Sequence, residues 1–275
     1  MLKLTSIVLF FASSGLLVWY FLKNDRGAKE PKGALYAAAG FGVLAVVAAV
    51  WAELFLPPPN PESTISTLLL AGLAIGIIEE SAKFIPLSLF IKNKAYFNEH
   101  TDGIIYFGIA GLTFGLIENL VYLFFYKNHL GGGELTGIFR LIVLFFFHAA
   151  STGIVGYYFA KAKIQHQSLV RSVVALVTMA LVHGLYDFLF LFAARTSDST
   201  YAVSDNASVL IVVALVSGLI ISALLNTFLF LYYGRARQWD ASIGLSSDPK
   251  LGNAASYRQQ PMAAQPAQAT ITRVL

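Results

Sequence analysis

Seven long apolar runs, separated by short polar connectors, dominate the hydrophobic pattern of the chain. Their approximate limits are residues 4–22, 33–56, 64–91, 103–126, 136–161, 170–194 and 208–234. About 20 apolar residues in a helix cross the hydrocarbon core of a bilayer, and each run is long enough to do so. Breaker-rich segments such as LPPPNPEST and HLGGGEL fill the connectors and favour turns. The pattern predicts an all-α fold, a polytopic transmembrane helical bundle of about seven spans.

Composition agrees with a membrane protein. The chain is 57% hydrophobic and only 12% charged, whereas a soluble domain is about 25% charged. Its net charge of +4 comes from basic residues in connectors beside the spans. We therefore interpret them as topology signals at the surface of a lipid bilayer and expect no nucleic-acid partner. The absence of cysteine excludes disulfides, thiolate metal sites and a cysteine nucleophile.

The distribution of Lys and Arg predicts the orientation. Basic residues gather in the first, third and fifth connectors and after the last span: Lys23, Arg26, Lys29, Lys32, Lys92, Lys94, Lys161, Lys163, Arg171, Arg235 and Arg237. Because cytoplasmic loops carry the excess of positive charge, the N-terminus is predicted outside and the C-terminus inside. We expect a transmembrane domain over residues 1–237, with a functional core at about 64–195. Residues 238–275, rich in Gln, Ala, Ser and Pro, are predicted to be a disordered cytoplasmic tail.

Particular residues predict how some spans begin and how they pack. Gly72 and Gly76 in the third span, and Gly111 and Gly115 in the fourth, have the small-xxx-small spacing of closely packed membrane helices. This spacing predicts that the third and fourth spans pack together. Asp102, just before an apolar run, is predicted to be the N-cap of the fourth span.

Ionisable residues lie deep in four of the spans, where a charge costs several kcal/mol unless it is compensated. They are Glu79, Glu80 and Lys83 in the third span, Glu118 in the fourth, His148 in the fifth, and His183 with Asp187 in the sixth. With a rise of about 1.5 Å per residue, the glutamates and histidines fall within about 5 Å of the bilayer midplane, and Asp187 lies one turn from His183. A common depth on four helices predicts one polar cavity.

The spacing and residue types in this cavity suit hydrolysis. Lys83 follows Glu79 by four residues and Glu80 by three, so it can pair with either carboxylate. Asp187 follows His183 by four residues and can fix the imidazole tautomer. A glutamate shielded from bulk water can act as a general base, and histidines can bind a water, an oxyanion or a metal. A structural ion pair and a proton relay of a transporter use the same residue types and stay open.

Four motifs occur in order on these spans: EESAK fits EExxK, FGLIEN fits FxxxE, HAAST supplies a histidine, and HGLYD fits HxxxD. Over about residues 70–195 the chain resembles the PrsW family of bacterial intramembrane proteases, which is distantly similar to CAAX-processing proteases and to Aph-1. The resemblance implies a glutamic-type or metal-assisted peptidase of the bacterial inner membrane. It also implies a membrane-anchored substrate of the anti-sigma-factor kind.

The resulting hypothesis assigns roles to seven residues. Catalytic roles fall to Glu79, Glu80, His148 and His183, and supporting roles to Lys83, Glu118 and Asp187. Either Glu79 or Glu80 is expected to be the base, while Lys83 keeps the other ionised. A divalent metal such as zinc stays an open possibility, with His148, His183 and Glu118 as candidate ligands. An Aph-1-like non-catalytic scaffold and a proton- or ion-coupled transporter are the alternatives, and the oligomeric state is not determined.

Overall fold

The fold is all-α, as predicted. The computed structural model describes residues 2–25, 27–57, 63–125, 133–197 and 207–244, and the described elements are seven helices. They are α1 (Leu2–Asn24), α2 (Lys32–Glu53), α3 (Ile65–Ile91), α4 (His100–Phe125), α5 (Gly133–Ile164), α6 (Val170–Ser197) and α7 (Ala207–Ser242). Within the described residues, α2, α4, α6 and α7 are long and apolar enough to cross a membrane. The total of seven spans and the orientation stay predictions.

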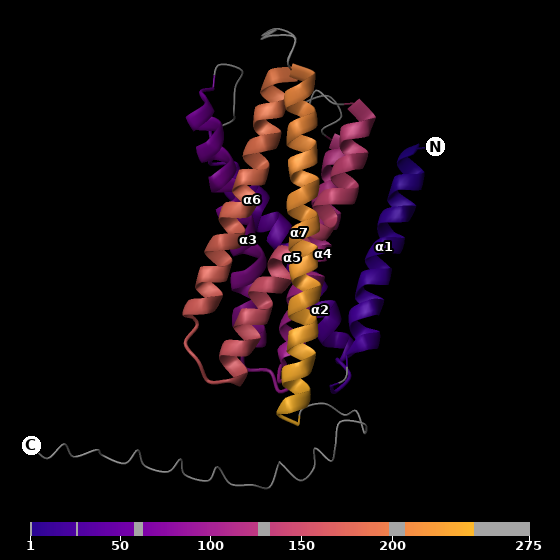
Figure 1. Cartoon of the computed structure of the whole chain (residues 1–275), viewed down its shortest axis with the longest axis vertical. Coiled ribbons are helices and arrows are strands. Elements are labelled where there is room, and N and C mark those ends of the chain that lie inside the picture. The colour runs from indigo at the N-terminus through magenta and orange to yellow at the C-terminus, as the bar shows by residue number, and fades with distance from the viewer. Residues whose placement is uncertain (1, 26, 58–62, 126–132, 198–206, 245–275) are drawn as a thin grey trace, which may run out of the picture.

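The helices form an up-and-down bundle with α1 at its edge (Figure 1). The first, third and fifth connectors and the C-terminal end of α7 lie at one end of this bundle. Contacts between them establish this: the Ala28 N–H donates to Glu99 Oε1 (2.8 Å), the His100 N–H donates to Asp240 Oδ1 (2.8 Å), and Lys163 Nζ donates to the Phe97 carbonyl. These are the connectors in which the basic residues gather. The arrangement is therefore compatible with the predicted cytoplasmic side.

The glycine pairs bring together different helices from those predicted. A Cβ at Gly76 of α3 would lie 2.5 Å from the backbone N of Gly184 in α6. A Cβ at Gly115 of α4 would lie 2.7 Å from Cδ2 of His148 in α5. The prediction that these glycines pair α3 with α4 is therefore wrong. Small residues let two helix backbones approach closely, but their spacing does not select the partner helix.

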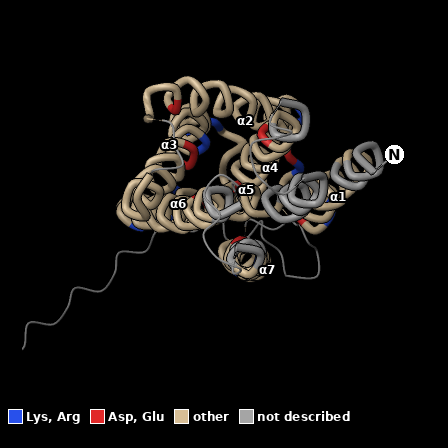
Figure 2. The backbone as a smooth tube through the Cα atoms, turned by 90° about the horizontal axis from the view of Figure 1, so that it is seen from above, with Lys and Arg blue, Asp and Glu red and all other residues tan. Residues whose placement is uncertain are grey.

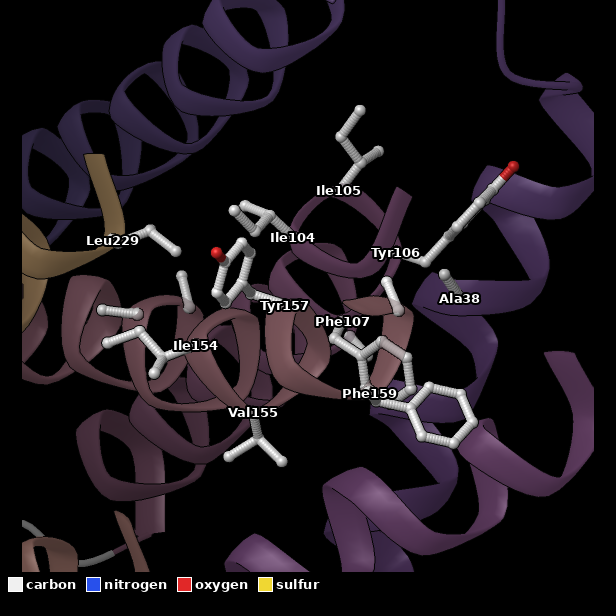
Figure 3. Close-up of a cluster of buried hydrophobic side chains, with 14 of the residues drawn as sticks. Ala38, Ile104, Ile105, Tyr106, Phe107, Ile154, Val155, Tyr157, Phe159 and Leu229 are labelled. Carbon is white, nitrogen blue, oxygen red and sulfur yellow. The ribbon is translucent and has the colours of Figure 1, made fainter. Parts of the chain in front are cut away.

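The packed core lies mainly between α4 and α5, with α2 and α7 on its flanks (Figure 3). Fully buried side chains there include Ile104 and Phe107 of α4, Val155 of α5 and Leu229 of α7. The outer faces, by contrast, carry exposed apolar side chains; Val177 of α6, for example, is 52% exposed. An apolar exterior of this kind suits contact with lipid rather than water.

The start of α4 differs from the prediction. The helix begins at His100, so Asp102 is its third residue and not the N-cap. The Asp102 carboxylate reaches back and accepts the Glu99 N–H (2.8 Å), as the third residue of a capping box does. Asp240 of α7 accepts the next two N–H groups, those of His100 (2.8 Å) and Thr101 (3.1 Å). The N-terminus of α4 is thus satisfied by two carboxylates, one of them from α7.

Helix α7 is longer than its apolar pattern predicts. It continues to Ser242, whereas the predicted span ends at residue 234 and the predicted tail begins at residue 238. The contacts of Asp240 with the start of α4 explain the extension, because they hold this turn of α7 against α4. Residues 245–275, which form most of the predicted tail, lie outside the described residues.

Candidate active site

The seven predicted site residues come together at the middle of the bundle, from α3, α4, α5 and α6. Glu79, Glu80, Lys83, His148 and His183 are each at most 5% exposed. Figure 2 shows charged positions on the inner side of α3, facing the middle of the bundle. The common depth predicted from the sequence therefore corresponds to direct contact. Glu118 and Asp187 contact the two histidines from α4 and α6.

Local sequence features hold α3 in place. The helix starts after Thr64, whose side chain accepts the Thr67 N–H (3.2 Å) as an N-cap. Pro86 lies inside α3, less than one turn after Lys83. Proline has no N–H, so the carbonyl of Ala82 loses its helical hydrogen bond there. The close approach of Gly76 to Gly184 brings the next turn of α3 against His183 of α6.

Glu80 is the hub of the site. Its Oε1 accepts hydrogen bonds from Lys83 Nζ (2.7 Å), Ser151 Oγ (3.0 Å) and His183 Nδ1 (2.9 Å). Lys83 Nζ is also 3.8 Å from Glu79 Oε2. Burial of a carboxylate is tolerated when donors and an opposite charge compensate it, and Glu80 has both. Glu80 therefore serves to position Lys83 and His183.

His183 has one ring nitrogen fixed and the other directed at carboxylates. Because Nδ1 donates to Glu80 Oε1, Nε2 carries the lone pair of the neutral ring. Nε2 lies 3.5 Å from both Glu79 Oε2 and Asp187 Oδ2. The expectation that Asp187 sets the tautomer is thus not met; Glu80, which is closer, does so. A carboxylate bonded to one ring nitrogen, with the lone pair on the other nitrogen, is the usual arrangement of a metal-binding histidine.

His148 faces Lys83 and Glu118. Its Nδ1 is 2.9 Å from Lys83 Nζ, and its Nε2 is 2.8 Å from Glu118 Oε2. An ammonium group only donates, so Nδ1 is the acceptor and Nε2 carries the hydrogen while Lys83 is bound there. That Nε2 is buried, with the Glu118 carboxylate beside it. His148 can therefore act as a proton donor, or as a ligand once Lys83 releases Nδ1.

Glu79 is much less engaged than Glu80. Its Oε2 makes no hydrogen bond with the described residues and has only the longer contacts to Lys83 and His183. Glu79, His148 and His183 each place one donor atom within 4.8 Å of the others. One carboxylate oxygen and two imidazole nitrogens are a donor set that suits zinc. The buried Glu79 Oε2 has no hydrogen-bond partner among the described residues, so this carboxylate fits a divalent metal.

Aromatic rings enclose these polar groups. Lys83 Nζ lies 4.5 Å from the centroid of the Phe114 ring, and the His148 ring is 5.2 Å from that ring. Phe147 lies 5.0 Å from the His183 ring. Apolar walls keep bulk water out and lower the local dielectric constant, so each charge in the site acts more strongly. The rings also restrict the rotamers of the two histidines.

Two side chains near the site were not predicted to take part. Glu53, at the end of α2, is close enough to interact electrostatically with Glu118, Asp187 and His183. An acidic residue within the apolar sequence AAVWAELFL is the signal that could have indicated it. Ser151 occurs in the HAAST motif, but its role became evident only through its hydrogen bond to Glu80. Of the residues left undecided, Asn119 satisfies the backbone by donating to the Gly115 carbonyl (2.8 Å), and the Tyr122 side chain lies outside the described residues.

The bundle and its centre define a class: an α-helical membrane protein with a buried glutamate–histidine site of hydrolytic type. The profile described as "PrsW family intramembrane metalloprotease" matches residues 30–231. The chain belongs to this family. It is accordingly an integral membrane protein and an intramembrane peptidase, and these findings favour neither the scaffold nor the transporter.

Curated relatives agree. The chain is 29% identical over 175 residues to "Protease PrsW" of Bacillus subtilis (strain 168), and the matched stretch covers 63% of this chain and 77% of that protein. It is 30% identical over 181 residues to "Protease PrsW" of Geobacillus kaustophilus (strain HTA426), covering 66% and 76%. The corresponding protein of Clostridioides difficile (strain 630) is 28% identical over 182 residues, covering 65% and 76%. No solved structure matches the chain.

Proposed function

We propose that this protein hydrolyses a peptide bond of a single-span, membrane-anchored protein in a bacterial cytoplasmic membrane. The observation that carries the proposal is the convergence of Glu79, His148 and His183 within 4.8 Å in the buried centre of the bundle. The relatives are bacterial proteases, which supports the bacterial membrane. The resemblance of the motifs to the family supports a substrate of the anti-sigma-factor kind.

Glu79, His148 and His183 are proposed to hold a divalent metal, with Glu118 as a further candidate ligand next to His148 Nε2. Such an ion, when bound, would polarise the scissile carbonyl and lower the pKa of a bound water. The fit rests on the buried Glu79 Oε2, which has no hydrogen-bond partner among the described residues. Glu118 was among the candidate ligands expected from the sequence, whereas Glu79 was expected only as a base.

The protein's own groups would perform the proton transfers. Glu79 is proposed to orient and deprotonate the attacking water through the carboxylate oxygen that does not bind the metal, because Glu80 is already engaged by three donors. Lys83 and Glu80 hold the two histidines in fixed tautomers. His148 is proposed to bind the metal through Nδ1 once Lys83 releases that nitrogen, because Nε2 carries the ring hydrogen while Lys83 is bound there. Asp187 Oδ2, 3.5 Å from His183 Nε2, would be a further carboxylate beside the metal-binding nitrogen.

Cleavage of a tagged single-span anti-sigma factor by the purified full-length protein in proteoliposomes tests the proposal. Glu79→Gln and His183→Ala are expected to lower the cleavage rate by roughly 10²- to 10⁴-fold, because each removes a group that moves or orients a proton. His166→Ala is the matched histidine control, since His166 is exposed in the connector after α5. Wild-type rates in both site variants would refute the proposal.

Metal analysis provides a readout that does not depend on activity. Roughly one divalent ion per chain is expected in the wild-type protein and in His166→Ala. Glu79→Gln and His183→Ala are expected to lose most of it while retaining the melting behaviour of a folded bundle. If the ion content is the same in all four proteins, the ligand assignment is wrong even when the loss of cleavage is observed.

A further inference from the structure

A groove of about 690 Å³ runs between α5, α6 and α7, and the peptidase chemistry does not involve it. Ile154 and Tyr158 of α5, Met179 of α6 and Tyr232 of α7 form much of its wall. Ile154 and Tyr158 lie on a different face of α5 from His148, whereas Met179 lies one turn before His183 on α6. The volume falls in the usual range of small-molecule sites, about 300–1,000 Å³.

Basic side chains stand at one end of the groove. Lys161 and Arg171 line it, and Arg235 is close enough to repel Lys161. Lys161 Nζ lies 4.3 Å from the Trp239 ring centroid, and Arg235 Cζ lies 5.9 Å from the Tyr232 ring centroid. Among the described residues, none of these three cations has a carboxylate within the 4 Å of an ion pair. Their charge is therefore available to an anion from outside the chain.

The groove has the length of one leaflet. Its lining on α6 runs from Arg171 to Val182, and these eleven helical steps correspond to about 16.5 Å along the helix axis. Half of the hydrocarbon core of a bilayer is about 15 Å thick. The basic end coincides with the end of the bundle that holds the basic connectors, and the other end lies beside His183 near the predicted midplane. Exposed apolar residues, such as Val174 (59% exposed), open the groove to the surrounding lipid.

Two tyrosines supply a polar group just below the cations. The hydroxyls of Tyr158 and Tyr232 are 2.8 Å apart. One hydroxyl donates to the other, so one O–H in the pair stays available to an acceptor. Tyr158 precedes Lys161 by three residues and lies about 4.5 Å deeper along α5. In a glycerophospholipid, the ester carbonyls likewise lie just below the phosphate.

We propose that the groove binds one anionic phospholipid of the cytoplasmic leaflet. Its phosphate and headgroup would contact Lys161, Arg171 and Arg235, an ester carbonyl would accept from the tyrosine pair, and its acyl chains would fill the apolar wall. Basic pockets between helices at the cytoplasmic surface recognise such headgroups. Charge complementarity selects an anionic lipid over a zwitterionic one. The proposal does not depend on the proposed peptidase mechanism.

The test is native mass spectrometry of the full-length protein titrated with phosphatidylglycerol or phosphatidylcholine. The wild-type protein is expected to bind phosphatidylglycerol more tightly. The double variant Lys161→Gln/Arg171→Gln is expected to bind it about 30-fold more weakly, with little change for phosphatidylcholine. Lys92→Gln/Lys94→Gln removes the same charge at the same end but outside the groove, and is expected to behave as wild type. Thr178→Phe, which fills the groove at an exposed position, is expected to weaken the binding of both lipids.

Several outcomes would overturn the proposal. Equal affinity of the wild-type protein for the two lipids would do so, as would an unchanged preference in the Lys161/Arg171 double variant. An equal loss in the control double variant would indicate general surface charge instead. Full competition by glycerol 3-phosphate would indicate a site for a soluble anion. Displacement by an apolar single-span peptide, with no dependence on the two cations, would assign the groove to a protein helix. Melting curves without added lipid establish that each variant is folded.

Discussion

Replacing Lys83 by methionine tests whether the buried charges of the site form one unit. Lys83 Nζ lies 2.7 Å from Glu80 Oε1 and 3.8 Å from Glu79 Oε2. At an effective dielectric constant of 20, these distances correspond to gross attractions of about 6 and about 4 kcal/mol. Desolvation offsets most of this attraction in the intact pair. Removing the cation alone, however, leaves buried carboxylates uncompensated, which typically costs about 3–5 kcal/mol.

The loss is measured as the free energy of unfolding from denaturant titration in mixed micelles. Lys83→Met is expected to cost about 3–5 kcal/mol, whereas Glu80→Gln/Lys83→Met should cost clearly less, because no unpaired charge remains at that pair. Lys94→Met is the matched control, since Lys94 also lies over a phenylalanine ring (4.7 Å) but outside the site. A loss below about 1 kcal/mol for Lys83→Met would refute the reasoning. So would a double variant whose loss equals the sum of the losses of Lys83→Met and Glu80→Gln measured singly.

Three further predictions concern packing, pH and the end of α7. Gly76→Leu is expected to abolish cleavage and destabilise the protein, because its Cβ would clash with Gly184, whereas Gly40→Leu, with open space around it, should melt as wild type. Burial raises the pKa of Glu99 from 4.5 to about 7. The folded state therefore binds more protons, and stability falls as the pH rises between these values; the slope of melting temperature against pH should flatten in Glu99→Gln. Asp240→Ala removes the acceptor at the start of α4 and should cost about 1–3 kcal/mol in the same unfolding assay, against no change for the exposed Ser242→Ala.

The sequence alone determined the helices and the level of the site. Long apolar helices depend on the length and polarity of single segments, so the seven helices were placed within a few residues except at the end of α7. Depth along a helix is also a local property, because each residue adds about 1.5 Å. The meeting of Glu79, Glu80, Lys83, His148 and His183 could therefore be predicted from four separate segments.

The tertiary structure decided which helices pair and which groups bond. Gly76 packs against α6 and Gly115 against α5, since small residues permit a close approach without naming a partner. That pairing makes Glu80 the hydrogen-bond partner of His183, and it leaves Glu79 as the less engaged carboxylate. Three further features also arise between distant segments. They are the proximity of Glu53 to the site, the capping of α4 by Asp240 and the basic end of the lipid-facing groove. Contacts of this kind depend on the rotation and neighbours of each helix, which only the packed bundle fixes.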